Sequence, residues 1–176
     1  MRTTWDVAGR TAVITGAARG IGEATARRLR GLGMNVVLAG LEQERLRAVA
    51  AELGEQALAV PCDVTSNEDL EAAVSAALER LGAIDVVVAN AGVNAVGTLE
   101  TSDLEQWERV IEVNLLGVTR TVRAALPHVI ARRGYILPVA SVAAVMPLAL
   151  GANYTAAKHG VHGFAQALRL EVAGHG

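Results

Sequence analysis

The chain has 176 residues, enough for one domain with a buried core, and we predict a single domain over residues 1–176. Its formal net charge of −2 provides no basic field for nucleic acid or an anionic membrane, so we expect neither partner. Hydrophobic residues make up 52% and charged residues 19%, which excludes disorder as the main state. With Cys62 as its one cysteine and no secretory signal, we expect a cytoplasmic protein without disulfides.

Short apolar runs alternate along the chain with longer segments of helical periodicity, which is typical of a parallel sheet with crossover helices. We predict five strands, at residues 11–15, 35–39, 57–61, 84–89 and 135–140. Helices are predicted at residues 21–32, 43–53, 66–81, over a long region from 102 to 131, and from about residue 153. The expected fold class is therefore α/β, with helices on both faces of a parallel sheet of about five strands.

Several of these helix ends carry local signals. Ser66 and Asp69 are spaced as in a capping box, and Gly82 is expected to end the same helix. Ser102 is the predicted N-cap of the long helix. Pro127 is expected to kink or break that helix, because proline removes a backbone donor.

The first predicted strand runs into a glycine-rich turn with Gly16, Gly20 and Gly22, and a helix follows at once. Such a turn allows close backbone approach and directs helix N-terminal amides at an anion, which suits a dinucleotide pyrophosphate. The spacing differs from the commoner Gly-x-Gly-x-x-Gly fingerprint, and a purely structural turn is the alternative. The strand-to-helix context favours the cofactor site.

The end of the second strand bears on the choice between NAD and NADP. The acid that would bind the ribose of NAD is missing there, since the strand runs into Gly40, Leu41 and Glu42. Arg19 in the glycine turn would suit a 2′-phosphate and leans the choice towards NADP, although Glu42 opposes this. The alternative for Arg19 is an ordinary solvated charge.

A tyrosine and a lysine carry the strongest chemical signal. Lys158 is the one lysine among sixteen basic residues, and it lies four residues after Tyr154, on the same face of a helix. A positive charge near a phenol favours the phenolate, which makes the tyrosine a usable proton shuttle. Ser141 follows the fifth strand, where its hydroxyl could bond to a substrate oxygen.

Polar residues also follow the third and fourth strands, where this architecture binds ligands. Asp63 would accept from an adenine amino group or cap a local turn, and Asn90 begins an Asn-Ala-Gly segment. Asn114, within the long helix, would need partners if buried, or would make a local backbone bond. His159 and His162 lack nearby acids, so we read them as solvated and predict no metal.

Together these motifs resemble the short-chain dehydrogenases/reductases: Thr15-Gly-x-x-x-Gly-Ile-Gly22, Asp63-Val64, Asn90-Ala91-Gly92, Val113-Asn114, Ser141 and Tyr154-x-x-x-Lys158. The resemblance implies a Rossmann-like three-layer αβα fold. It also implies an NAD(P)-dependent oxidoreductase that interconverts a secondary alcohol and a ketone by hydride transfer.

The resemblance also implies roles for individual residues. Tyr154 would be the acid-base residue, Ser141 would polarise the substrate oxygen, Lys158 would bind the ribose and favour the tyrosinate, and Asn114 would hold a water in the proton relay. Residues expected to bind the cofactor are Gly16, Arg19, Gly20, Ile21, Gly22, Asp63, Val64, Asn90, Ala91, Gly92, Tyr154 and Lys158.

Relatives continue with further strands, whereas this sequence stops at Gly176, so the resemblance implies a C-terminal truncation and an exposed edge at the fifth strand that invites pairing. One alternative is therefore an inactive nucleotide-binding fragment, and another is a different Rossmann-like class, such as a methyltransferase or a sugar-nucleotide epimerase. A dimer or tetramer through the long helix and the Tyr-Lys helix is expected. The apolar segments 93–98 and 143–152 suggest a hydrophobic alcohol or ketone as the small-molecule substrate.

Overall fold

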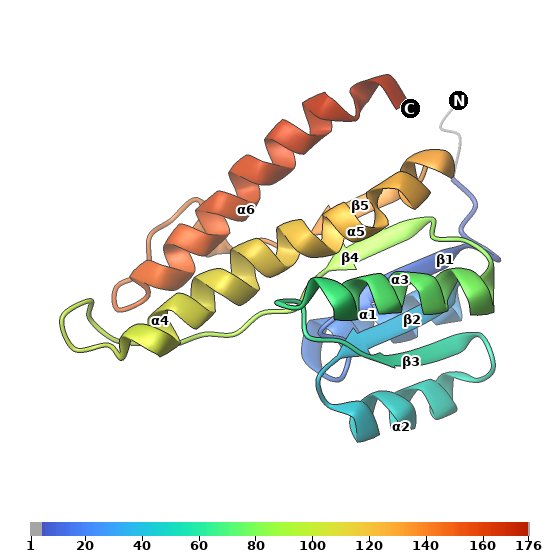
Figure 1. Ribbon diagram of the computed structural model, residues 1–176, viewed down its shortest axis with the longest axis horizontal. Helices are drawn as coiled ribbons and strands as arrows, with labels where there is room; N and C mark the ends of the chain where they lie inside the picture. Colours follow the sequence, from blue (N-terminus) through green and yellow to red (C-terminus); the bar gives the residue numbers. More distant parts are fainter. Residues whose placement is uncertain (1–4, 176) are drawn as a thin grey trace.

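Five parallel strands form the centre of the molecule, and the computed structural model describes residues 5–175 (Figure 1). The strand order is β3-β2-β1-β4-β5, and Ala12 of β1 lies opposite Val36 of β2 on one side and Val86 of β4 on the other. The expected α/β class is therefore confirmed. The strands are β1 (Thr11–Thr15), β2 (Asn35–Gly40), β3 (Ala57–Pro61), β4 (Val86–Ala89) and β5 (Tyr135–Pro138).

Helices α1 to α5 lie between successive strands, α6 follows β5, and all lie close to their predicted ranges. In chain order they are α1 (Gly20–Gly31), α2 (Gln43–Leu53), α3 (Asn67–Leu81), α4 (Leu104–Ile111), the π-helical turn η1 (Glu112–Leu116), α5 (Gly117–Ala131), the 3-10 turn η2 (Val142–Ala144), α6 (Ala152–Glu171) and the 3-10 turn η3 (Ala173–His175). Within residues 5–175, no helix is both long and apolar enough to cross a membrane.

The strands bury both faces, because successive side chains of a strand point to opposite sides of the sheet. Val36 and Leu38 belong to the core under α1 and α2, whereas Val37 between them belongs to the core under α3 and α5. Helix α6 packs on α5 beyond the sheet, through a smaller cluster that includes Val122 and Val161. The result is a three-layer arrangement with its ligand-binding end at the carboxyl ends of the strands.

The predicted capping box of α3 is present, since Ser66 Oγ accepts from Asp69 N at 3.1 Å. One other expectation about the helix ends was wrong. Asp103 caps α4 instead of Ser102, because Asp103 stands directly before the helix and its carboxylate accepts from Gln106 N at 2.9 Å. Helix α5 continues through Pro127, so the long helix does not break there, and its α-helical hydrogen bonding is interrupted at η1.

A buried carboxylate joins the amino ends of three strands. Asp85 is 1% exposed, and its Oδ1 accepts from Arg10 Nη1 and Arg132 Nε, each at 3.0 Å. Its Oδ2 accepts from Thr11 N at 3.0 Å. Because both oxygens have hydrogen-bond partners, the cost of burying this polar group is offset.

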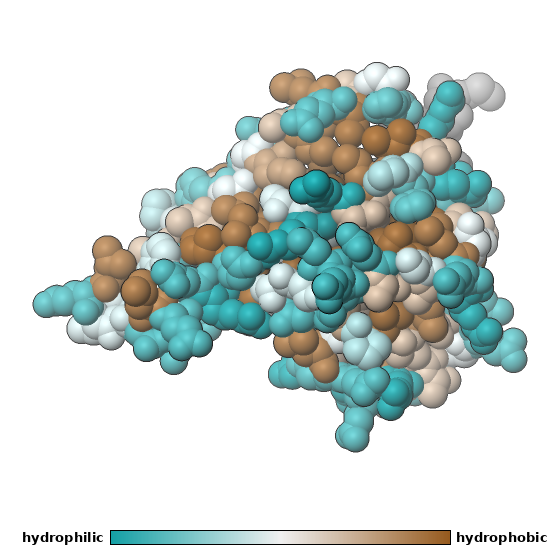
Figure 2. All heavy atoms as spheres, in the orientation of Figure 1, coloured by the Kyte–Doolittle hydropathy of each residue, from teal (hydrophilic) through white to brown (hydrophobic). Residues whose placement is uncertain are grey.

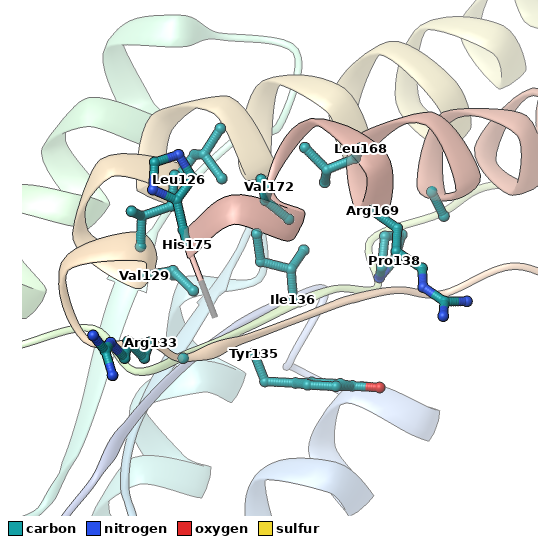
Figure 3. A pocket seen from close by; sticks show the side chains of 13 residues that line it. Leu126, Val129, Arg133, Tyr135, Ile136, Pro138, Leu168, Arg169, Val172 and His175 are labelled. Atoms are coloured by element: carbon teal, nitrogen blue, oxygen red, sulfur yellow. The ribbon is translucent and has the colours of Figure 1, made fainter.

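The outer edge of β5 borders a hollow of about 470 Å³ between the strand and the C-terminal parts of α5 and α6 (Figure 3). Leu126, Leu168 and Val172 face the gap, with Arg133 and Arg169 at its rim. Figure 2 shows hydrophobic residues at the surface around the C-terminal part of α6. This hollow contains no residue of the glycine turn, so it is separate from the candidate cofactor site.

Candidate cofactor and active site

The glycine turn between β1 and α1 has a backbone that requires glycine. Gly16 has φ +64° and Gly20 has φ +58°, in the left-handed region that favours glycine. A Cβ on Gly22 would overlap the carbonyl oxygen of Gly16, and open space lies where a Cβ of Gly20 would stand. Arg19 makes no side-chain cap at the start of α1, so the helix presents uncapped amides to a ligand. This geometry fits a pyrophosphate.

A hollow of about 520 Å³ lies beside this turn, at the carboxyl ends of β1 to β4. Most of the predicted cofactor-binding residues line it: Gly16, Arg19, Ile21, Asp63, Val64, Asn90, Ala91 and Gly92. Gly20 and Gly22 shape the turn without lining the hollow. The sequence-predicted residues from the first four strands are therefore brought together.

Asn90 holds the glycine turn against the end of β4. Its Nδ2 donates to Thr15 O at 2.9 Å, and Thr15 Oγ1 accepts from the backbone amides of Asn90 at 3.0 Å and Ala91 at 3.1 Å. A Cβ on Gly16 would stand 2.8 Å from Ala91 Cα, so the two turns pack at backbone distance. Thr15 is thus a structural member of the site that the motif contained but that we did not select.

Asp63 is a charged acceptor on the opposite wall of this hollow. Its Oδ1 accepts from Thr65 N at 2.9 Å and Thr65 Oγ1 at 2.8 Å, and its Oδ2 pairs with Arg109 Nη2 at 3.3 Å. Partial burial raises the pKa of this carboxyl, but the Thr65 hydrogen bonds and Arg109 outweigh it, so the pKa lies below its ordinary value. Asp63 therefore remains ionised at neutral pH.

Arg19 and Glu42 form an ion pair across the mouth of the hollow. The Glu42 carboxylate thus pairs with the Arg19 guanidinium, which we predicted would bind a 2′-phosphate. Both side chains are exposed, at 75% and 42%, so the pair itself adds little stability. Its importance lies in the charge that it presents to a ligand.

Lys158 joins the Tyr-Lys helix to the end of the sheet. It is 4% exposed, and its Nζ donates to Val139 O at 2.8 Å. Val139 N in turn donates to Ala89 O at 2.9 Å, next to Asn90. The ammonium lies 5.7 Å from the centre of the Tyr154 ring, as the i, i+4 spacing predicts. Burial lowers the pKa of Lys158, since its charged form has lost water.

Ser141 directly precedes η2, which packs against α6. Its Oγ accepts from Ala143 N at 3.2 Å, and its own hydroxyl hydrogen has no partner among residues 5–175. That hydrogen can therefore be donated to a substrate oxygen. Ser141, Tyr154 and Lys158 do not line the hollow beside the glycine turn.

Asn114 is fully buried in the π-helical turn η1 and connects it to the loop after β4. Its Nδ2 donates to Val93 O at 2.7 Å and Val110 O at 2.9 Å, and its Oδ1 accepts from Val93 N at 3.1 Å. Both amide hydrogens are used, so a water held by this side chain would have to bind through its oxygen. Val93 itself lines the cofactor hollow.

Comparison with known proteins decides the family. The family described as short chain dehydrogenase matches residues 10–176. The chain belongs to the short-chain dehydrogenase family. The chain is 38% identical to trans-4-hydroxycyclohexanecarboxylate dehydrogenase of Sinomonas cyclohexanicum, with 94% of this chain and 68% of the relative covered. It is also 38% identical to 3beta-hydroxysteroid dehydrogenase 1 of Eggerthella lenta, with 97% and 68% covered.

A solved structure of a short-chain dehydrogenase shows the same fold. The protein, from Burkholderia phymatum in complex with NAD, has a TM-score of 0.94 and 32% sequence identity. The match covers 98% of this chain and 63% of that one, so this short-chain dehydrogenase sequence spans less than two thirds of its neighbour's length.

Further residues of this short-chain dehydrogenase line the cofactor hollow without having been selected as site residues, among them Cys62, Arg109 and Val113. Val113 stands beside Asn114 in the quoted motif, so its position was within reach of sequence reasoning. Arg109 carries no such signal, since it is one of several charges on an exposed helix and meets Asp63 only in the folded chain.

Proposed function

We propose that this chain is an NAD(P)-dependent oxidoreductase that interconverts a secondary alcohol and a ketone. The observation that carries the proposal is the hydrogen bond from Lys158 to Val139, because it fixes the Tyr154 helix to the same end of the sheet as the glycine turn. The family match and the NAD held by the Burkholderia phymatum neighbour support a nicotinamide dinucleotide as the cofactor. A bound nicotinamide would supply or accept the hydride.

The remaining steps belong to the chain's own side chains. During alcohol oxidation Tyr154 would take the hydroxyl proton, and during ketone reduction it would return a proton to the oxygen. The nearby Lys158 ammonium would stabilise the phenolate that forms. Ser141 would donate its free hydroxyl hydrogen to the substrate oxygen and stabilise negative charge there.

The cofactor choice rests on Arg19 and Glu42. Arg19 would attract a 2′-phosphate and favour NADP, whereas Glu42 already pairs with the guanidinium and brings a negative charge to the same place. We propose that these two residues act in opposite directions on the ratio of NADPH to NADH affinity.

For the substrate we propose an alicyclic secondary alcohol or the corresponding ketone. Val142, Val145, Met146 and Leu148 are all exposed in the segment that leads from Ser141 to α6, and they provide an apolar surface beside the proposed chemistry. Two relatives are named for acting on a hydroxycyclohexane carboxylate and a hydroxysteroid, which supports this class.

The test combines binding and turnover. NADH and NADPH are titrated into the purified chain, and hydroxycyclohexane and hydroxysteroid substrates are then assayed by the change in nicotinamide absorbance. Tyr154→Phe should bind the cofactor like the wild type but lose at least about 100-fold in turnover, since a general acid-base residue contributes that much or more. Full turnover in this variant would disprove the role of Tyr154, and tight binding without any turnover would favour the inactive nucleotide-binding fragment.

A further inference from the structure

An ion pair crosses the cofactor hollow from α4 to the end of β3. Arg109 Nη2 lies 3.3 Å from Asp63 Oδ2, although the two residues are 46 positions apart, and both line the hollow that contains the glycine turn. The side chains are 45% and 28% exposed, so a ligand can reach both. An exposed ion pair of this kind contributes little to the free energy of unfolding. Stability therefore does not explain why the pair lies beside the hollow.

The alternative partners of Arg109 lie on its own helix. Glu105 stands four residues earlier, the spacing and orientation that favour an ion pair along a helix. Within the described residues Arg109 makes no ion pair with Glu105, and Glu112 pairs with Arg120. Arg109 therefore extends away from its helix neighbours and towards the hollow.

The two oxygens of Asp63 have separate partners. Oδ1 accepts both the amide and the hydroxyl of Thr65, which uses its two lone pairs and fixes the carboxylate plane. Oδ2 meets only Arg109 among residues 5–175, so one lone pair remains for a ligand donor. The arginine thereby sets where that remaining acceptor stands.

We propose that Arg109 is a positioning residue for the adenine end of the cofactor, which holds Asp63 Oδ2 where it accepts a hydrogen bond from the adenine amino group. This inference rests on the proposed function, because it takes a dinucleotide as the ligand. It adds a recognition element on α4, outside the glycine turn and the Tyr-Lys helix. An adenine in this place would be distinguished from hypoxanthine, which has an oxygen in place of the amino group.

The experiment measures dissociation constants for NADH and for its hypoxanthine analogue by titration calorimetry. The wild type should bind NADH roughly tenfold tighter than the analogue, the effect of one hydrogen bond to a charged acceptor. Arg109→Met keeps the aliphatic part of the side chain but removes the guanidinium group. It should weaken NADH binding about fivefold to tenfold and change the affinity for the analogue less than twofold. Arg109→Lys should restore part of the discrimination.

Arg123→Met is the matched control, because Arg123 is exposed on α5 and its side chain makes no hydrogen bond with the described residues. It should leave both constants unchanged. Equal weakening of NADH and its analogue in Arg109→Met, or no change in either, would overturn the positioning role. Failure of the wild type to bind any dinucleotide would instead disprove the proposed function, which makes the two failures distinguishable.

Discussion

Replacing Gly22 by alanine tests the physical account of the glycine turn most directly. The new Cβ would overlap Gly16 O and stand 2.7 Å from Asn90 Nδ2, so the turn or the end of β4 must move. Overpacking of a tight site costs about 1–3 kcal/mol, and loss of an Asn90 hydrogen bond adds about 1 kcal/mol. We expect Gly22→Ala to lower the free energy of unfolding by about 2–4 kcal/mol.

Urea denaturation followed by circular dichroism would measure this change, and the melting temperature should fall by roughly 5–15 °C. Gly31→Ala is the matched control on the same helix, because a Cβ there meets no atom within 4 Å. Alanine is the better helix former, so the control should be neutral or slightly stabilising, by up to about 1 kcal/mol. If both variants showed the same stability, close backbone packing would not be the reason for glycine at position 22.

Four further outcomes are expected. Glu42→Gln should raise the ratio of NADPH affinity to NADH affinity, and Arg19→Ala should lower that ratio. If direct titrations gave the same ratio in both variants and the wild type, the proposed opposite effects of Arg19 and Glu42 would be wrong. Ser141→Ala should reduce kcat about 100-fold to 1000-fold with little change in cofactor affinity, as steady-state kinetics would show. Burial, together with the charges of Asp69 and Asp63, raises the pKa of the Cys62 thiol to about 12. A disulfide reagent should therefore label Cys62 only when the chain unfolds. Rapid labelling of the native chain would count against the burial of this thiol. Burial lowers the pKa of Lys158 below its ordinary value of 10.5, so the lysine keeps its proton to higher pH in the unfolded state than in the folded state. The free energy of unfolding of the wild type, minus that of Lys158→Met, should therefore rise as the pH approaches 10.5. A fall in this difference would refute the predicted sign.

Much of the fold could be predicted because it depends on local periodicity. Buried parallel strands need continuous apolar runs, and the helix ends at Ser66 and Gly82 depend on residues close in sequence. The wrong N-cap has a local reason as well. Ser102 and Asp103 are both good capping residues, and their order relative to the first helical turn decides between them.

The parts that could not be predicted depend on contacts between distant residues. The π-helical turn accompanies the hydrogen bonds between Asn114 and Val93, which are 21 residues apart, and no periodicity indicates it. The pairing of Arg109 with Asp63 has the same origin. By contrast, the Tyr154 and Lys158 pair was predictable because one helical turn places the two side chains together.

The carboxylate of Asp85 marks the pole of the sheet opposite the glycine turn, and it joins three strands through Arg10, Arg132 and Thr11. If a library of random variants is sorted first by solubility and then by retention on a dinucleotide resin, the substitutions in each class should therefore lie in different parts of the structure. Substitutions that make the chain insoluble should concentrate around Asp85. Substitutions in soluble variants that no longer bind the resin should concentrate around the glycine turn. Substitutions around Asp85 should thus act through stability, whereas substitutions at the glycine turn should change recognition, and stability as well where the backbone is closely packed, as at Gly22.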